Sequence, residues 1–346
     1  MFGVFRLFLA FNVVAFHILS VPSIGPFAVY SFFILSGLLM TTIMHNTYGY
    51  SFSGFKKYAM NRFLRLYPVY WSLLLVAVAM MFFVGNSFYS AFHTRINMPQ
   101  NISEWLANLT MIYPDYNPVN YPVRLAPATW ALTIEIFYYL LIGLGLSKNK
   151  WISTLWFSLS LGYVIFNVIM GRFTAGYGNV TSASLPFSIG AMIYWYKDEI
   201  MVVIRRISPA YFLIFTTLFI LNLVVITIAQ ILFPEEAWKF GTVGTYANLF
   251  LTTFLIVILL EDGRRFVSKK VDKIMGDLSY PVYIFHWSAA AFASWLIYDD
   301  VRKGFNIDGL MVFLLGCVIT ILVSLIVNKF VNDQIEVIRQ NVKSSN

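Results

Sequence analysis

The chain has very little charge and almost no cysteine. Asp, Glu, Lys and Arg make up only 12% of its 346 residues, whereas a soluble domain carries about 25%. The one cysteine, Cys317, excludes an internal disulfide, and it argues against thiolate catalysis and cysteine-based zinc sites. The four histidines stand singly, without a pair at ligand spacing, so we expect no metal site. No glycine-rich phosphate loop is present.

Apolar residues dominate instead. They make up 59% of the chain, 18% of it is aromatic, and the mean hydropathy is +0.72. Stretches without charge recur at about 20 residues, the length that crosses a bilayer. We therefore expect an all-α polytopic membrane protein with about ten transmembrane helices. The predicted spans are 3–21, 27–44, 67–84, 129–146, 151–170, 180–196, 210–232, 242–260, 279–297 and 309–328.

Basic residues predict the orientation of these spans. With the N-terminus inside, 18 of the 24 Lys and Arg residues fall in cytoplasmic segments and 6 in outer loops. This bias places both termini in the cytoplasm, so residues 331–346 form a cytoplasmic tail behind a single domain over 1–330. The net charge of +8 is then a topology signal, and we expect no nucleic-acid partner. The first apolar segment lacks a cleavage site, so we expect a retained span rather than a signal peptide.

One connection is long. Residues 85–128 form an outer loop that carries five of the twelve prolines. Within it, Asn101 and Glu104 resemble a capping box that begins a helix too short to span. We expect an interfacial or re-entrant helix there. The loop either shapes a substrate mouth or serves as a structural lid without ligand contact.

Arg6 and His17 are the most informative polar residues of the first span. They stand eleven residues apart, and eleven steps of about 100° return a helix to nearly the same face. A basic residue and an imidazole are costly in hydrocarbon, so they indicate a functional site facing the protein interior.

Glu135 lies in the outer half of the fourth predicted span and is the only charged residue between Arg124 and Lys148. A carboxylate there needs a partner or stays protonated. Its predicted depth is close to that of His17, so a Glu–His acid/base pair is allowed. The alternative is a structural role, in which the buried Glu bonds to a Tyr or Trp.

Arg62 and Arg65 are three residues apart and share a helix face just before Pro68, which we expect to open the third span. They either anchor the cytoplasmic side, beside an aromatic belt, or clamp an anionic cytoplasmic ligand. The residues alone favour anchoring.

Six segments carry a family resemblance, in order along nearly the whole chain. They are FRLFLAFNVVAFH at 5–17, SFFILSGLLM at 31–40, RFLRLYPVYW at 62–71, TWALTIEIFYYL at 129–140, LSYPVYIFHW at 278–287 and NDQIEVIRQ at 332–340. Together they resemble the acyltransferase 3 family, integral-membrane acyltransferases that modify bacterial surface sugars. Gln334 departs from the pattern, since a proline is usual there.

The resemblance implies a membrane O-acyltransferase, with O-acetyl transfer the leading expectation. The acyl group would pass from cytoplasmic acyl-CoA to a hydroxyl of a surface or exported polysaccharide (O-antigen, exopolysaccharide or capsule). It makes His17 and Glu135 the catalytic candidates and shifts the arginines toward donor contact, with Arg6, Arg62 and Arg65 binding acyl-CoA. Further candidates to line the crevice are Ser36, Tyr138, Tyr280 and His286; the alternative for His286 is a core histidine bonded to a neighbouring span. No bound cofactor is expected, and acetyl-CoA or another acyl-CoA is the co-substrate.

The expected partners are thus acyl-CoA, a carbohydrate acceptor and the bilayer of the inner or plasma membrane. From Arg6 to His17 the helix rises about 16 Å, so the donor would thread its pantetheine arm up a polar crevice. His17 would act as general base, or carry the acyl group covalently. The alternative function is a transporter or flippase for a lipid-linked sugar.

Overall fold

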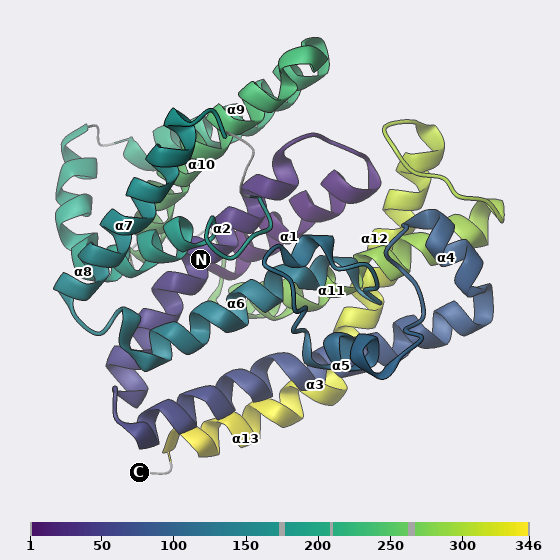
Figure 1. The fold of residues 1–346 in the computed structure, drawn as a ribbon, viewed down its shortest axis with the longest axis horizontal. Coiled ribbons are helices and arrows are strands. Elements are labelled where there is room, and N and C mark those ends of the chain that lie inside the picture. The colour runs from purple at the N-terminus through teal and green to yellow at the C-terminus, as the bar shows by residue number, and fades with distance from the viewer. Residues whose placement is uncertain (1, 173–176, 208–209, 262–266, 345–346) are drawn as a thin grey trace. The chain divides into compact units, whose positions relative to one another are not determined.

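The computed structural model describes residues 2–172, 177–207, 210–261 and 267–344 (Figure 1). Every regular element in these ranges is a helix, which confirms the all-α prediction. Arg264 and Arg265, which the orientation argument counted as cytoplasmic, lie outside the described residues. The chain divides into two compact units.

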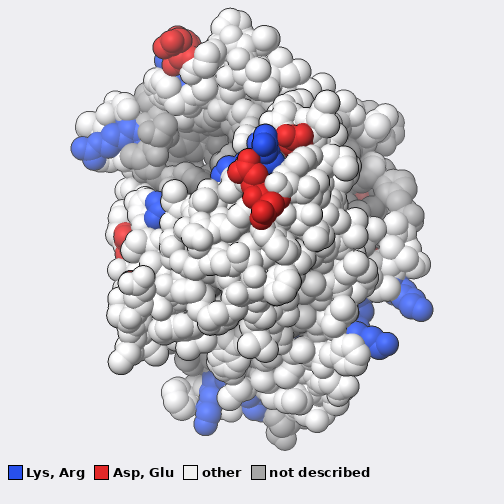
Figure 2. Space-filling model, turned by 90° about the vertical axis from the view of Figure 1, so that its right-hand side faces the viewer, with Lys and Arg blue, Asp and Glu red and all other residues white. Residues whose placement is uncertain are grey.

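Within the described residues, seven helical segments are long and apolar enough to cross a membrane. They are Ile24–Tyr48, Phe52–Val84, Pro127–Leu146, Lys150–Ile169, Tyr211–Leu232, Pro234–Leu260 and Ile307–Lys343. The other three predicted spans fall on α1 (Phe2–Ile18), which is shorter, and on α8 (Ser184–Ile207) and α11 (Lys269–Tyr298), which are less apolar. On the face drawn in Figure 2, uncharged side chains cover most of the surface. The chain is a multi-pass membrane protein, while the count of ten and the orientation stay predictions.

Unit 1 comprises residues 1–2, 22–55 and 135–269. Its elements are α2 (Ile24–Ile43), η1 (Met44–Tyr48), the end of α6 (Trp130–Leu141), η4 (Ile142–Leu146), α7 (Lys150–Ile169), α8, α9 (Tyr211–Leu232), η5 (Pro234–Glu236) and α10 (Ala237–Leu260). Helix α2 packs against α8 and α10, while α7 packs on α8 and α9 on α10.

Two glycines let α2 and α8 approach closely. A Cβ on Gly37 would lie 2.1 Å from the carbonyl oxygen of Phe187, and one on Gly190 would lie 2.2 Å from that of Ile34. Neither distance is possible for a real side chain, because both neighbours are backbone atoms. Gly37 of the SFFILSGLLM motif therefore has a packing role, and it holds the adjacent Ser36 in place on α2.

Unit 2 comprises residues 3–21, 56–134 and 270–346. Its elements are α1, most of α3 (Phe52–Val84), α4 (Asn86–Phe92), α5 (Ile102–Thr110), η2 (Pro118–Asn120), η3 (Pro127–Thr129), the start of α6, most of α11, α12 (Ile307–Val327), η6 (Asn328–Asn332) and α13 (Asp333–Ser344). Both ends of α1 are held. Asp272 Oδ1 accepts from the Val4 N–H at 3.0 Å, and the Gly304 N–H donates to the Ile18 carbonyl at 2.8 Å. The second contact fixes the turn that carries His17.

Pro68 lies inside a helix rather than at its start, because α3 begins at Phe52 and runs through this proline to Val84; where the third span opens stays a prediction. A proline inside a helix removes one backbone hydrogen bond. Membrane helices tolerate the loss because neighbouring groups satisfy the freed carbonyl. Arg62 and Arg65 consequently lie on the same continuous helix as the apolar span.

The short helix of the long loop is α5. Asn101 caps it by accepting from the Glu104 N–H at 2.9 Å, as the capping box predicts. Its last turn is held by α3, since the Tyr67 hydroxyl donates to the Thr110 carbonyl at 2.6 Å and the Trp71 indole N–H to the Leu109 carbonyl at 2.9 Å.

These α3 aromatics therefore bind protein backbone, beyond the belt role expected of them. Trp71 lies 13 residues before the end of α3 at Val84, a distance of about 20 Å along the helix. The end of α5 therefore packs against α3 within unit 2. Whether α5 is interfacial or re-entrant stays a prediction.

Candidate active site

Three aromatic rings meet where α1 ends and α11 is buried. The His17 ring stacks on the His286 ring, with centroids 5.4 Å apart and planes 12° apart. The Trp287 indole lies 4.8 Å from His17, centroid to centroid. His286 is 1% exposed and Trp287 is 4% exposed. The structure thus brings together two sequence candidates, His17 and His286, which lie 269 positions apart in the chain.

The hydrogen bonding of His286 defines its tautomer. Its Nδ1 lies 2.9 Å from the carbonyl oxygen of Tyr283. A carbonyl only accepts, so Nδ1 carries the proton and Nε2 of the neutral ring carries a lone pair. This Nε2 and the indole nitrogen of Trp287 are buried without a hydrogen-bond partner among the described residues. Buried polar atoms are normally satisfied, so both nitrogens remain available to a substrate.

His93 extends the cluster from the segment after α4. Its ring meets the Trp287 ring edge to face, with centroids 4.3 Å apart. The Arg95 backbone N–H donates to His93 Nδ1 at 3.1 Å. Lys303 Nζ donates to the Phe92 carbonyl at 2.7 Å and lies 5.9 Å from the centre of the Trp287 ring.

Arg124 is the most buried cation near these rings, at 2% exposure. Its Nη1 donates to the Pro118 carbonyl at 2.9 Å, and its Nε has no hydrogen-bond partner among the described residues. Burial lowers the pKa of Arg124 to about 10 and also lowers the pKa of Lys303. Within the described part of the chain, Arg95, Arg124 and Lys303 form no salt bridge.

The pKa of His93 reflects this positive charge. Burial first, and then the charges of Arg124, Lys303 and Arg95, lower the pKa of His93 to about 4. The imidazole is therefore neutral at physiological pH. We call this group the histidine site; it consists of His17, His93, Arg95, Arg124, His286, Trp287 and Lys303. Neutral imidazoles beside uncompensated cations can accept a proton and stabilise a negative charge.

Sequence reasoning missed five members of the site: His93, Arg95, Arg124, Trp287 and Lys303. Each is a single residue, and all but Trp287 lie in connections that have no helical periodicity. The basic residues entered the sequence argument only as outer-loop charges. The signal that was present is the position of Arg124 and Lys303 in predicted outer loops, where basic residues are expected to be rare.

Glu135, the other catalytic candidate, lies in unit 1. The Ser36 hydroxyl donates to its Oε1 at 2.9 Å, and the Tyr139 hydroxyl donates to its Oε2 at 2.8 Å. A tyrosine partner is what the structural alternative predicted, and Ser36, a crevice candidate, joins it. Because His17 belongs to unit 2, its pairing with Glu135 stays a prediction.

The remaining crevice candidates have their own partners. In unit 1, the Tyr138 hydroxyl donates to the Val180 carbonyl at 2.8 Å, and its ring stacks on Phe187 with centroids 4.6 Å apart. In unit 2, the Tyr280 hydroxyl donates to the Leu66 carbonyl at 3.1 Å. Both tyrosine hydroxyls therefore donate to backbone carbonyls.

The donor candidates Arg62 and Arg65 lie in a second polar group of unit 2. Arg65 forms a salt bridge with Asp277 at 3.2 Å and also donates to Asn332 Oδ1 at 3.4 Å. Arg62 Nη2 donates to Asn61 Oδ1 at 2.8 Å. Arg6 lies on α1, partly buried.

The closing NDQIEVIRQ segment supplies a third arginine to this group. Arg339 is 6% exposed, donates to Asn61 Oδ1 at 3.2 Å and pairs with Glu336. Figure 1 shows α13 running alongside α3, as these bonds require. We call Arg62, Arg65 and Arg339, with Asn61, Asp277, Asn332 and Glu336, the arginine cluster.

Fold and site together define a class: a multi-pass α-helical membrane protein with a buried site of imidazoles and cations. The family model described as acyltransferase domain matches residues 2–329, nearly the whole chain. The chain therefore belongs to this family, the acyltransferase 3 family of membrane acyltransferases, as its six motifs predicted. No curated protein and no solved structure matches it in the same comparisons.

Proposed function

We propose that the chain transfers an acyl group, with acetyl the leading candidate, from cytoplasmic acyl-CoA to a hydroxyl of a surface or exported polysaccharide. The observation that carries this proposal is the histidine site. It holds neutral imidazole rings together with three cations that have no carboxylate partner among the described residues. Acyl transfer to a hydroxyl needs both features, a base for the hydroxyl proton and positive charge for the oxyanion of the tetrahedral intermediate.

In the simplest sequence, His17 removes the acceptor hydroxyl proton while the oxygen attacks the thioester carbonyl carbon. The oxyanion forms within reach of Arg124 and Lys303. Collapse of the intermediate breaks the carbon–sulfur bond, and His17 returns the proton to the leaving thiolate. Glu135 would orient the imidazole, the role that sequence predicts for it.

The variant is a relay through His17 itself. The imidazole nitrogen attacks the thioester, CoA leaves as the thiol, and the acyl-imidazole then passes its acyl group to the acceptor oxygen. The relay predicts that labelled acetyl-CoA leaves label on the protein when no acceptor is present. Absence of label in rapidly quenched samples, with transfer intact, supports the general-base sequence.

The arginine cluster is the proposed place for the charged end of the donor. Guanidinium groups bind phosphate oxygens through paired hydrogen bonds. Arg62 and Arg65, with Arg6 as a third contact, would hold the CoA phosphates while the thioester reaches His17. Arg339 belongs to the same cluster and is added here to the donor candidates.

The test uses the purified protein in nanodiscs, labelled acetyl-CoA and cell-surface glycan. We expect wild type to label the glycan, and His17→Ala to lower kcat by about 10²- to 10⁴-fold. His45→Ala is the matched control, since His45 lies in unit 1 with its Nε2 3.1 Å from the Ser147 carbonyl. A folded His17→Ala variant that transfers label as fast as His45→Ala would falsify the catalytic role.

A further inference from the structure

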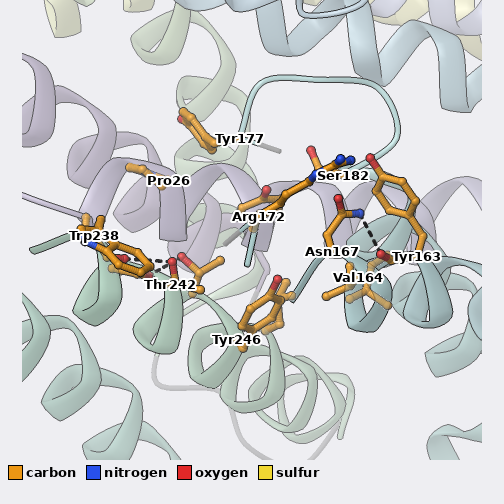
Figure 3. A pocket seen from close by; sticks show the side chains of 16 residues that line it. Pro26, Tyr163, Val164, Asn167, Arg172, Tyr177, Ser182, Trp238, Thr242 and Tyr246 are labelled. Carbon is orange, nitrogen blue, oxygen red and sulfur yellow. Dashed lines mark hydrogen bonds between the residues drawn. The ribbon is translucent and has the colours of Figure 1, made fainter. Parts of the chain in front are cut away.

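Unit 1 contains a pocket that none of the roles above uses. It has a volume of about 270 Å³, just below the range of about 300–1,000 Å³ typical of small-molecule sites. Its lining comes from α2, α7, α8 and α10 (Figure 3). The residues on which the argument depends are Tyr30 of α2, Asn167 of α7, Arg172 after α7, and Trp238, Thr242 and Tyr246 of α10. We call it the aromatic pocket; its size suits one ring-sized ligand.

Several polar side chains of the pocket donate their hydrogen bonds to backbone carbonyls of their own helices. Thr242 and Thr245 each donate the hydroxyl proton to the carbonyl four residues earlier in α10, at 2.9 and 2.8 Å. Asn167 Nδ2 donates to the carbonyl of Tyr163 at 2.8 Å. The hydroxyl oxygens keep lone pairs, and Asn167 Oδ1 bonds to none of the described residues. Such a lining favours a ligand rich in O–H donors.

Aromatic faces make up much of the remaining wall. Tyr30 and Tyr177 meet edge to face, with centroids 6.0 Å apart, and Trp238 and Tyr246 stay 44% and 37% exposed. A flat, apolar face with a polar edge matches the C–H face and hydroxyl rim of a sugar ring. The combination of stacking faces and acceptor oxygens points to a saccharide rather than to a lipid tail.

Arg172 adds charge specificity. It is the only Asp, Glu, Lys or Arg residue among those that line the pocket, and it forms no salt bridge with any part of the chain that the structure describes. A guanidinium without a counter-ion binds carboxylate or phosphate strongly. Arg172 also lies in a segment that the sequence assigns to the outer side.

We propose that the aromatic pocket binds one residue of a saccharide that carries a carboxylate or phosphate group. The inference rests on the proposed function, because it assigns unit 1 a subsite for the acceptor polysaccharide. Arg172 would bind the anionic group, Trp238 and Tyr246 the ring face, and the Thr and Asn oxygens the ring hydroxyls.

Binding is measured on the full-length protein in nanodiscs without acyl-CoA, by saturation-transfer NMR. The probes are glucuronate and glucose 1-phosphate, with glucose as the neutral match. We expect at least one anionic sugar to bind about tenfold more tightly than glucose, and Arg172→Gln to remove the preference. Whichever of glucuronate and glucose 1-phosphate binds more tightly shows whether the pocket prefers a carboxylate or a phosphate. Equal binding of all three sugars, or none, overturns the proposal.

Trp238→Ala tests the stacking face, with Trp151→Ala as control because Trp151 is 82% exposed on α7 and lies outside the pocket. We expect only Trp238→Ala to weaken sugar binding, by about tenfold, and to raise the acceptor KM while donor KM stays constant. If both variants bind alike, the pocket assignment is wrong. If sugars bind but no acyl group is ever transferred, the proposed function fails while the pocket assignment stands.

Discussion

The histidine site and the arginine cluster are both rich in cations, yet their charges are compensated differently. In the arginine cluster, Arg65 is paired with Asp277 and Arg339 with Glu336. In the histidine site, Arg124 and Lys303 form no salt bridge with any described residue. Both groups belong to unit 2, so the contrast exists within one compact unit.

A buried charge without a partner lowers the stability of the fold by several kcal/mol. We expect a protein that keeps such a cation to bring it together with an anion during its function. In the histidine site that anion is proposed to be the oxyanion of the reaction, which exists only near the transition state. The arginine cluster, by contrast, would exchange its carboxylates for phosphates that are charged in the ground state. Transition-state contacts change kcat, whereas contacts made equally in the ground state change KM. The two groups should therefore separate in kinetics.

Of the substitutions that test this contrast, we expect one at Arg124 to change kcat most. We expect Arg124→Gln to lower kcat about 10²- to 10³-fold, as for the loss of one oxyanion donor, and to leave donor KM within a few-fold of wild type. Glutamine keeps a polar amide at this position without the charge, so the fold should persist. Steady-state kinetics with labelled acetyl-CoA give both constants.

Thermal unfolding separates this from a structural role. Removing an uncompensated buried cation should leave the unfolding midpoint unchanged or raise it. A lower midpoint with unchanged kcat would mean that Arg124 only holds the loop in place, and the contrast with the arginine cluster would collapse.

A smaller effect is expected in the arginine cluster. Replacing Arg62 and Arg65 together by alanine should raise the KM for acetyl-CoA by about ten- to a hundredfold. This equals about one hydrogen bond to a charged group, at about 1.5–3 kcal/mol, because both arginines give up existing bonds to Asn61 and Asp277 when they bind phosphate. The value of kcat should change far less. Initial rates over a range of acetyl-CoA concentrations test this.

Asp277→Asn is the matched control, because it removes the salt bridge of Arg65 while keeping the arginine. We expect donor KM to stay constant or fall, since the guanidinium no longer exchanges one anion for another. A rise as large as that of the double alanine variant would show that the pair matters for structure and not for the donor.

How much the sequence predicted differs between these groups. Arg62 and Arg65 could be found because three-residue spacing on a helix is visible in sequence, and His17 because an imidazole in an apolar segment is conspicuous. The stack of His17 on His286 depends on tertiary packing of α1 against α11 over most of the chain length. The predicted ninth span places His286 near mid-membrane but does not reveal which ring it contacts.

The loop residues were beyond sequence reasoning for a physical reason. Arg124 is placed by α5, because Asn108 of α5 bonds to the backbone on both sides of it. Helix α5 is in turn held on α3 by Tyr67 and Trp71. Aromatic residues near a membrane edge predict anchoring to lipid headgroups, and nothing in their spacing reveals backbone partners. Likewise Pro68 indicates a helix start by local rules, which the packing of α3 overrides.

The pH dependence of stability tests the positive charge around His93 in the histidine site. The pKa of His93 is lowered from 6.5 to about 4, by burial and then by neighbouring cations. Between these values the unfolded chain binds the proton and the folded protein does not, so the free energy of unfolding falls as pH drops from about 6.5 to about 4. His93→Gln should make this decline shallower in thermal melts from pH 7 to pH 4. If the unfolding midpoint depends on pH in the same way in wild type and His93→Gln, the positive charge assigned to the site is contradicted.

The smallest effect is expected at Asn61, whose Oδ1 accepts from both Arg62 and Arg339 at 2.8 and 3.2 Å. Asn61→Ala should lower the free energy of unfolding by about 1 kcal/mol and raise donor KM only a few-fold, because both guanidiniums keep their charge. Asn61→Asp is the informative counterpart. An added carboxylate should tighten the cluster and compete with phosphate, so stability rises while donor KM also rises. If donor KM falls with Asn61→Asp, the cluster does not bind an anion and its resemblance to the histidine site is only one of composition.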